Sequence, residues 1–371
     1  MAQLKEERVW DLPTRLFHWL MVLAFALAWA TYDNSRHLDI HTISGYTFFG
    51  LLLFRLIWGV VGSHYARFSE FSYAPGEAWS YIRSLFGSGV KHYIGHNPAG
   101  AWAIFILLTL GLLLAVSGVL LLGGEEQQGP FAGYISFDQS VPFSMLHEAV
   151  AWAMIVLVAV HVGGVVIESI LHRENLVGAM FRGTKWITGE SAMVPAHRLV
   201  ASMMFITVII WGGLSLNTYL VATNDQPYLP FKGPSLAMNE QWNEECGACH
   251  LAFHPGLLPI RAWQHLFAQQ EDHFQEDLML DEETLIELMN YARENSAEKR
   301  QTEAAWKINR SVMKNETPLK ITEVAYWKEK HADITDAVWQ QESIQSKANC
   351  GACHHDAEQG TFQDAAMKIP E

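Results

Sequence analysis

The sequence predicts an all-α protein: a bundle of five membrane-spanning helices followed by a mainly helical soluble domain. Two observations predict this architecture. The 371 residues are 50% hydrophobic but only 17% charged, against about 25% charged residues in ordinary soluble domains. The charges are also unevenly divided, because residues 1–222 carry 12 Lys and Arg against 14 Asp and Glu, whereas residues 223–371 carry 13 against 25. We therefore expect a membrane domain over 1–222, a linker over 223–240 and a soluble domain over 241–371.

The composition also argues against several other classes of protein. A net charge of −14 disfavours a nucleic-acid binder, which needs a basic surface. Four cysteines in the whole chain are too few for a disulfide scaffold. A chain that is half hydrophobic can bury enough apolar surface to fold, so disorder is excluded as well.

The membrane domain is predicted from five long apolar runs. Each has about 20 residues, the length that a helix needs to cross the roughly 30 Å hydrocarbon layer. Buried helices of a large soluble core would be the alternative, but runs with almost no charge are atypical of such a core. The first run lacks a small-residue cleavage site, so we interpret it as a signal anchor. The runs are Leu16–Tyr32, Ile43–Val61, Trp102–Leu122, Ala149–Ile170 and Leu199–Val221.

Loop charges predict the orientation, because inside loops of membrane proteins carry an excess of Lys and Arg. The loops 33–40 and 123–143 hold only Arg36 as a basic residue. The opposite segments are richer, which places the amino end inside and, after five crossings, the soluble domain outside. Their basic residues are Lys5, Arg8, Arg15, Arg67, Arg83, Lys91, Arg173, Arg182 and Lys185.

All four cysteines lie in two copies of the motif Cys-Gly-Ala-Cys-His, at 246–250 and 350–354. C-x-x-C-H is the attachment signature of c-type haem, because two thiols bond the haem vinyl groups and the next histidine reaches the iron. Paired C-x-x-C can also hold zinc, and a redox motif needs a βαβ pattern that is not seen here. We interpret the motifs as two covalent haem c sites, attached through Cys246, Cys249, Cys350 and Cys353, with iron ligands His250 and His354.

Haem c is attached outside the cytoplasmic membrane in bacteria, so the motifs agree with the orientation from the loop charges. We expect a multi-pass protein of the bacterial inner membrane with a periplasmic C-terminal domain. Each c haem that carries electrons needs a second axial ligand. His254 and His355 follow the proximal histidines too closely to reach the opposite haem face. Position alone leaves open His265, His273, His331, Met279, Met313 and Met367.

Further residues around the two motifs form a recognisable pattern: Gly256–Pro259, Trp263, His273–Phe274, Glu276–Asp277, Pro318–Thr322, Tyr326–Trp327, His331 and Ala357–Gly360. Together with the motifs, they resemble the dihaem cytochromes c over most of 241–371. The resemblance implies two bis-histidine haems. It also implies His273 as the distal ligand of the first haem and His331 as that of the second.

Histidines in the membrane domain predict further haem sites. His147 and His161 are fourteen residues apart, which puts them on one helix face about 21 Å apart along the axis. Ionisable residues inside a membrane are costly and indicate function. This spacing suits two haems, one near each membrane surface. By depth, His161 pairs with His18 near the inner surface and His147 with His41 near the outer one, with His37 as the alternative to His41.

A second resemblance covers about 1–190. It is carried by Trp10–Arg15 with His18–Trp19, His41–Gly45, Arg55–Gly62, Ala66–Phe68, His96–Pro98 with Gly100, His147 and His161. These residues resemble the bacterial cytochrome b561 and nickel–iron-hydrogenase cytochrome b family. The resemblance implies two b haems held by the first, second and fourth helices of a four-helix core. The fifth run goes beyond that core.

Two further features of the membrane domain each allow more than one interpretation. Arg55 is fourteen residues after His41, and we interpret it as a partner of a haem propionate, with a quinone-site or snorkelling role as the alternative. His96 and Asn97 are compatible with a helix cap or with the lining of a quinone pocket. We interpret the other inside-loop histidines as solvated or interfacial; they are His64, His92, His172 and His197.

Haems with both axial positions filled carry electrons rather than substrates. We expect electron transfer from membrane quinol through two b haems and two c haems to a periplasmic acceptor, with quinol:cytochrome c-type oxidoreductase as one form of that activity and no catalytic side chain. Electron entry from a periplasmic donor to quinone, including a superoxide-oxidase-like activity, and a haem-based sensor are the alternatives. Expected partners are lipid, the quinone pool and a redox protein with a basic docking face, since the tail's net −12 attracts one. A homo-oligomer stays open.

Overall fold

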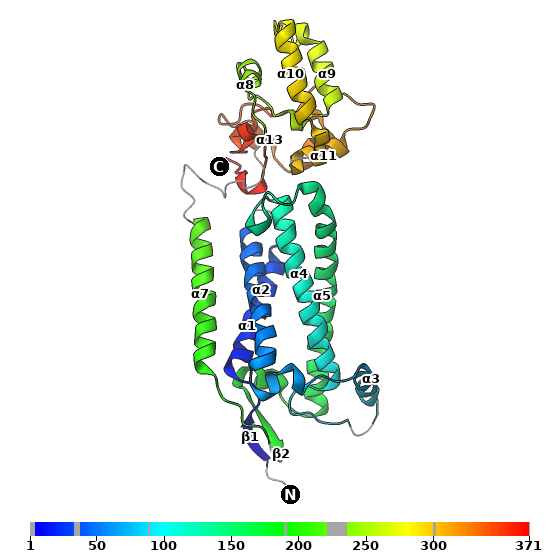
Figure 1. The fold of residues 1–371 in the computed structure, drawn as a ribbon, viewed down its shortest axis with the longest axis vertical. Coiled ribbons are helices and arrows are strands. Elements are labelled where there is room, and N and C mark those ends of the chain that lie inside the picture. Colours follow the sequence, from blue (N-terminus) through cyan, green and yellow to red (C-terminus); the bar gives the residue numbers. More distant parts are fainter. Residues whose placement is uncertain are drawn as a thin grey trace. The chain divides into compact units, whose positions relative to one another are not determined.

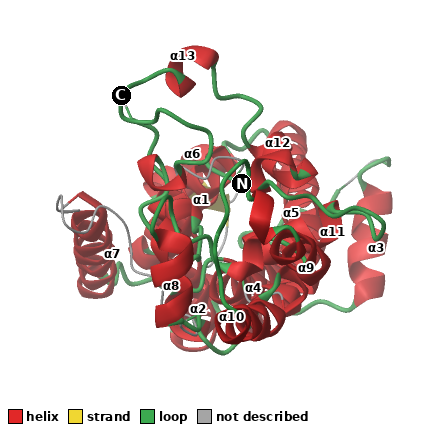
Figure 2. Ribbon diagram, turned by 90° about the horizontal axis from the view of Figure 1, so that it is seen from above, coloured by secondary structure: helices red, strands yellow, loops and turns green. Residues whose placement is uncertain are grey.

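The computed structural model describes residues 4–32, 38–87, 90–188, 191–220, 236–299 and 302–370. Within them nearly all regular structure is helical (Figure 2), which confirms the predicted fold class. The chain separates into two compact units, Met1–Gly118 with Met145–Val221 and Val119–Ser144 with Ala222–Glu371. His37 and most of the expected linker lie outside the described residues.

Five helices in the described part of the chain are long and apolar enough to cross a membrane (Figure 1): α1 (Leu12–Ala30), α2 (Leu38–Val61), α4 (Pro98–Glu125), α5 (Phe137–Leu171) and α7 (Arg198–Leu220). They contain the five predicted apolar runs, except for the last residues of the first and fifth runs. They expose large apolar side chains such as Ile57, Val60 and Ile170, which are 64%, 70% and 71% exposed. Such faces are stable against lipid, and the chain is an integral membrane protein.

The membrane helices pack through two small clusters of buried side chains. Ala24, Phe48, Leu52, Leu108 and Met154 join α1, α2, α4 and α5. A second cluster, made by Phe17, Leu51 and Met204, packs α7 against α1 and α2. The four helices that carry the predicted haem ligands or flank them therefore form one bundle, and the fifth helix runs alongside it (Figure 1).

The start of α1 is fixed by a buried carboxylate. Asp11 is fully buried and is the N-cap, because its Oδ1 accepts a hydrogen bond from the Thr14 backbone N–H at 2.7 Å. Its Oδ2 accepts a second bond from Trp58 Nε1 at 3.1 Å, near the end of α2. Pro13 in the first turn supplies a backbone angle already suited to a helix. One side chain thus sets both where α1 begins and how it meets α2, which fixes the height of His18.

Short elements complete the end of the first unit where α1 begins. They are α3 (Pro75–Ser84), α6 (Leu176–Arg182) and a two-stranded antiparallel sheet of β1 (Leu4–Arg8) and β2 (Thr184–Thr188), in which Leu4 lies opposite Thr188. The sheet was not among the expected elements. Gly183, at a φ of 87°, ends α6, and its carbonyl accepts hydrogen bonds from Val9 and Trp10. Only glycine adopts that angle freely, so the turn joins the chain's first residues to the segment after α5.

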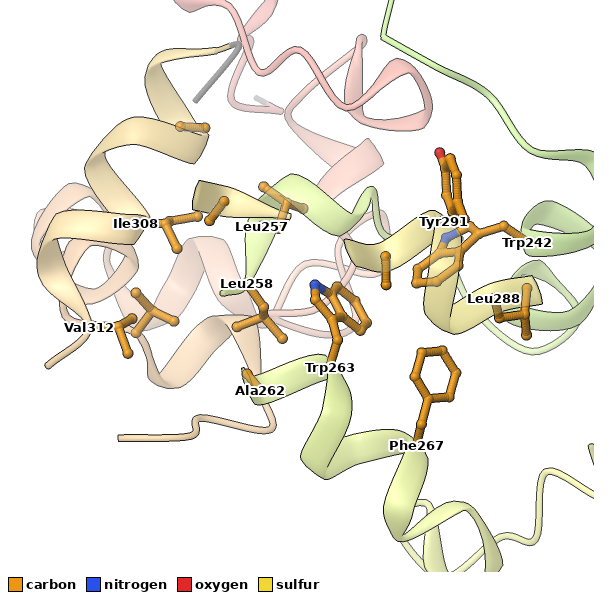
Figure 3. Close-up of a cluster of buried hydrophobic side chains, with 14 residues drawn as sticks. Trp242, Leu257, Leu258, Ala262, Trp263, Phe267, Leu288, Tyr291, Ile308 and Val312 are labelled. Atoms are coloured by element: carbon orange, nitrogen blue, oxygen red, sulfur yellow. The ribbon is translucent and has the colours of Figure 1, made fainter. Parts of the chain in front are cut away.

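The second unit contains α8 (Glu240–Gly247), α9 (Ile260–Ala268), α10 (Glu282–Asn295), α11 (Glu303–Ser311), α12 (Ala325–Lys330) and α13 (Asp336–Trp339). Its core is a cluster of buried side chains that includes Trp242, Leu258, Trp263 and Leu288 (Figure 3). The Trp263 indole N–H donates to the Pro255 carbonyl at 2.8 Å, so the buried donor is satisfied. Helix α8 ends inside the first haem motif, and this core therefore positions Cys246.

Candidate haem-binding sites

The first candidate site lies between α2 and α5. The rings of His41 and His147 have their centres 6.2 Å apart and are inclined by 67°. A bond from a metal ion to an imidazole nitrogen is about 2 Å long, so two imidazoles on opposite sides of one iron have ring centres about 6 Å apart. The pair therefore has the separation that a bis-histidine haem requires.

Main-chain carbonyls orient both of these rings. His41 Nδ1 lies 2.8 Å from the carbonyl oxygen of Ala28, and His147 Nδ1 lies 3.0 Å from that of Leu114. A carbonyl oxygen only accepts, so each Nδ1 carries the hydrogen and each Nε2 keeps its lone pair for a metal. A hydrogen bond from the ring nitrogen that does not bind the metal, here Nδ1, fixes the tautomer and the ring direction of metal-binding histidines.

Gly118 on α4 makes room for the His147 ring. A Cβ built at this position would lie 2.9 Å from His147 Cε1 and 3.2 Å from Nδ1. Ser117, which is 2% exposed, places its hydroxyl 3.2 Å from the same Nδ1. The sequence alone does not indicate the role of Gly118 or Ser117, because nothing in an all-apolar helix shows which face meets a ligand.

We expect Gly118→Ala to displace His147, since a methyl group cannot stay at 2.9 Å from a ring held by a backbone carbonyl. The purified protein should lose up to one of two b haems, measured as the pyridine haemochrome ratio of b to c. Gly50→Ala is the matched control, because a Cβ at Gly50 meets nothing within 4 Å. An unchanged haem b content and unchanged b potentials in Gly118→Ala would contradict this role.

The second candidate site lies between α1 and α5 and holds His18 and His161. His161 is close enough to His18 for the two side chains to interact electrostatically. His18 Nδ1 is buried and has no hydrogen-bond partner. Cβ atoms at Gly163 and Gly164, which follow His161 on α5, would meet nothing within 4 Å.

Arg55 on α2 is a buried cation in the half of the bundle where α1 begins. The residue is 4% exposed, and its guanidinium carbon lies 4.6 Å from the centre of the Phe68 ring. Its Nη1 is buried without a hydrogen-bond partner. An unpaired buried donor on a cation is expensive. The environment therefore fits an anionic group such as a haem propionate, which would pair with Nη1.

The two haem motifs of the second unit each meet a histidine from another segment. His250 and His273 have ring centres 6.2 Å apart, and His331 and His354 are also 6.2 Å apart. The structure thus brings together both predicted pairs at the separation seen for His41 and His147. Of the four cysteines in these motifs, none forms a disulfide.

The surroundings keep these imidazoles in the form that binds iron. His250 Nδ1 lies 2.7 Å from the Leu251 carbonyl oxygen, and His331 Nδ1 lies 2.7 Å from that of Trp327. Burial lowers the pKa of His273, and the neighbouring His250 lowers it further. Burial likewise lowers the pKa of His331 and His354. Neutral imidazole is the metal ligand, so these shifts favour ligation.

Two buried residues of the second unit were not singled out as ligands or ligand partners. His254, which follows the proximal histidine too closely to reach the opposite haem face, is 8% exposed, and its Nδ1 accepts from the Gly256 backbone N–H at 3.0 Å. Asp356 is 1% exposed, and its Oδ2 accepts from the Thr361 hydroxyl at 2.6 Å. Its charge raises the pKa of His354 against the larger effect of burial. Asp356 lies two residues after the second haem motif, and this position is the sequence feature that could have indicated a role for it.

Comparisons with known proteins cover both parts of the chain. Residues 9–183 match the family described as prokaryotic cytochrome b561, and residues 242–362 match the family described as dihaem cytochrome c. A probable Ni/Fe-hydrogenase B-type cytochrome subunit of Azotobacter chroococcum mcd 1 is 30% identical over 209 residues, covering 47% of this chain and 86% of that protein. Its counterpart from Azotobacter vinelandii is 29% identical with the same coverage.

Solved structures are similar to the C-terminal part. The diheme cytochrome c from Rhodobacter sphaeroides is 35% identical and covers 35% of this chain and 100% of its own, with a TM-score of 0.31. A diheme cytochrome type c from Shewanella baltica OS155 is 28% identical and covers 36% and 93%, with a TM-score of 0.29. The chain therefore belongs to the prokaryotic cytochrome b561 family and carries, fused to that membrane domain, a dihaem cytochrome c domain.

Proposed function

We propose that the chain carries electrons across the bacterial inner membrane, from a membrane quinol through two b haems to two c haems and on to a periplasmic acceptor. The observation that carries this proposal is the 6.2 Å ring separation found in three histidine pairs, one in the membrane unit and two in the C-terminal unit. The proposed iron ligands are, pair by pair, His18 with His161, His41 with His147, His250 with His273, and His331 with His354.

Paired imidazoles make these sites suited to electron transfer. Two histidines on one iron leave no open position for a substrate or a gas. A bound haem supplies a one-electron couple, and the chain's residues set its place and its ligand orientation. Both b sites use α5, so the same helix serves the inner and the outer half of the membrane. Joining the domains in one chain gives the c haems a high effective concentration near the membrane domain.

Charge supports the proposed orientation of the chain and the proposed kind of partner. Basic residues before α1 and after α5 support a cytoplasmic position for those ends, because inside loops are enriched in Lys and Arg. Residues 223–371 then face the periplasm with a net charge of −12. An acidic domain attracts a basic soluble redox protein and speeds its association.

A potentiometric titration of the purified protein in detergent, with a haemochrome count, tests this function. We expect two b and two c haems, b potentials below the c potentials, and reduction of all four by a short-chain ubiquinol or menaquinol. Reduced protein should then pass electrons to a basic cytochrome c at a rate that falls as salt is raised.

Three other outcomes would point elsewhere. Potentials of the b haems above those of the c haems would favour electron flow from a periplasmic donor to quinone. Carbon monoxide binding to the reduced wild-type protein would reveal an open axial position and favour a sensor. Fewer than four haems would mean that at least one histidine pair is assigned wrongly.

A further inference from the structure

A cavity of about 260 Å³, including its open mouth, lies near the ends of α3 and α5 in the membrane unit. It is lined by ionisable and polar side chains rather than by apolar ones. They are His92, Tyr93, Asn97, Glu168, His172, Glu174 and Lys185, together with Gly95 and Leu176. His92 and His172 were expected to be solvated or interfacial, without a connection to the haem sites.

The ionisable groups of this cavity contact one another in a series. The Tyr81 hydroxyl donates to Glu168 Oε1, and Glu168 Oε2 lies 3.3 Å from His172 Nε2. The His172 ring centre is 5.1 Å from that of His92. His92 Nε2 in turn lies 3.2 Å from Glu174 Oε2. Ionisable side chains thus follow one another from Tyr81 to Glu174, and the step between His172 and His92 is a contact of the two rings.

One end of the series is buried and the other is open. The side chains of Glu168 and His172 are 14% and 15% exposed, whereas that of His92 is 43% exposed. Lys185, with its side chain 3% exposed, places Nζ 3.4 Å from Glu174 Oε2. Burial lowers the pKa of Lys185, and Glu174 opposes that effect. Glu174 Oε1 is itself buried without a hydrogen-bond partner, so the cluster contains an acceptor that no protein donor satisfies.

The Tyr81 end of the series adjoins Asn97, whose side chain is a hydrogen-bond partner of Tyr81. Asn97 lines the cavity, and its neighbour His96 lies between the rings of Trp10 and Phe71, at 4.8 Å and 4.4 Å. The charges of Arg55 and His161 both act on His96, after burial, to lower its pKa to about 3. His96 is therefore an uncharged residue beside the proposed inner haem ligand, and its Nδ1 is buried without a partner.

We propose that the side chains from Tyr81 through Glu168 and His172 to His92 conduct protons between a quinone bound beside His96 and the aqueous phase at this end of the helices. The inference rests on the proposed function, which supplies the quinol and places this end in the cytoplasm. Quinol gives up two electrons and two protons to become quinone. The electrons reduce two ferric haems one at a time, and the two O–H protons leave through the series to water.

Glu168→Gln in the full chain, reconstituted with its haems in lipid vesicles, tests the proposal. The amide keeps the shape and the hydrogen-bonding capacity of the side chain but cannot carry a proton at neutral pH. We expect reduction of the b haems by a short-chain quinol to slow by about 100-fold or more, because a proton-transfer group typically contributes about 100-fold to 10,000-fold. Reduction by dithionite, which delivers electrons without quinol chemistry, should keep its wild-type rate. Haem content and potentials should stay unchanged.

Three variants serve as controls and replicates of this result. Glu70→Gln neutralises a carboxylate in the loop after α2 and outside the cavity, and it should behave as wild type. Glu168→Asp should restore much of the rate, because it restores a carboxylate. Tyr81→Phe should slow the quinol reaction without changing the dithionite reaction.

Opposite results overturn the inference in distinguishable ways. Wild-type quinol rates in both Glu168→Gln and Tyr81→Phe would exclude proton transfer through the series. A loss of haem b in Glu168→Gln would give the cluster a structural role and exclude the proposal. If no quinol reduced the wild-type protein, the proposed function would be wrong and this inference would fail with it. If quinol reduces the wild type, a slower reaction in the variants tests the proton path alone.

Discussion

His161→Ala is expected to remove one of the two b haems and to leave both c haems in place. The proposed b haems would be held by axial bonds and packing alone, so a site with one remaining imidazole is expected to lose its cofactor during purification. The proposed c haems would be attached through Cys246, Cys249, Cys350 and Cys353 and would not depend on α5. The haemochrome spectrum should therefore show half the b absorbance at an unchanged c absorbance.

His172→Ala is the control for this variant, because it removes a histidine from just beyond the same helix without touching either proposed pair. It should keep both b haems. Two b haems in His161→Ala would mean that another residue supplies the inner ligand, and the pairing of α1 with α5 would have to be abandoned. Quinol reduction of the remaining haems in His161→Ala should be slowed strongly, since the inner site is the proposed entry point.

His331→Ala is expected to convert one c haem from low spin to high spin. The thioether bonds and His354 keep the haem in the chain, but the distal position opens. About half of the reduced c haem should then bind carbon monoxide, and a high-spin absorption band should appear. His331 also stacks on Trp327 with ring centres 4.2 Å apart, so a His331→Met variant, which retains a ligand of similar reach, separates loss of ligation from loss of packing.

The exposed residue His265 provides the matched control. His265→Ala should leave both c haems low spin and unreactive toward carbon monoxide. An unchanged low-spin spectrum in His331→Ala would remove His331 from the ligand set and direct attention to the methionines of the domain.

Much of the fold could be predicted from the sequence because the strongest signals are local. Apolar runs of membrane length give the five helices directly, and each C-x-x-C-H motif is complete within five residues. The histidine pairs could be proposed from helix depth and from resemblance, and three of the four are brought to the same ring separation. Their assignment as iron ligands stays a prediction that the variants above test.

The remaining features depend on contacts between distant segments. An α-helix that is apolar all round gives no periodic signal for the face that turns inward, so Gly118 and Ser117 could not be placed against His147. The pairing of Leu4–Arg8 with Thr184–Thr188 joins segments far apart in the chain, and a five-residue strand leaves almost no pattern. The sequence shows Glu168 and His172 as ionisable residues, but it does not predict their contacts with Tyr81 and His92. Those contacts depend on how the loop before α4 folds back.

The position of His147 and His161 on one helix makes the distance between the two b sites a property of covalent structure. Each residue added or removed between them would turn one ligand by about 100° relative to the other and shift it by about 1.5 Å. Segment 148–160 can therefore exchange its apolar side chains freely, but it cannot change in length. A rigid helix also resists bending, so tilting of the bundle in a thicker or thinner membrane would move both sites together and leave the electron-transfer distance between them constant.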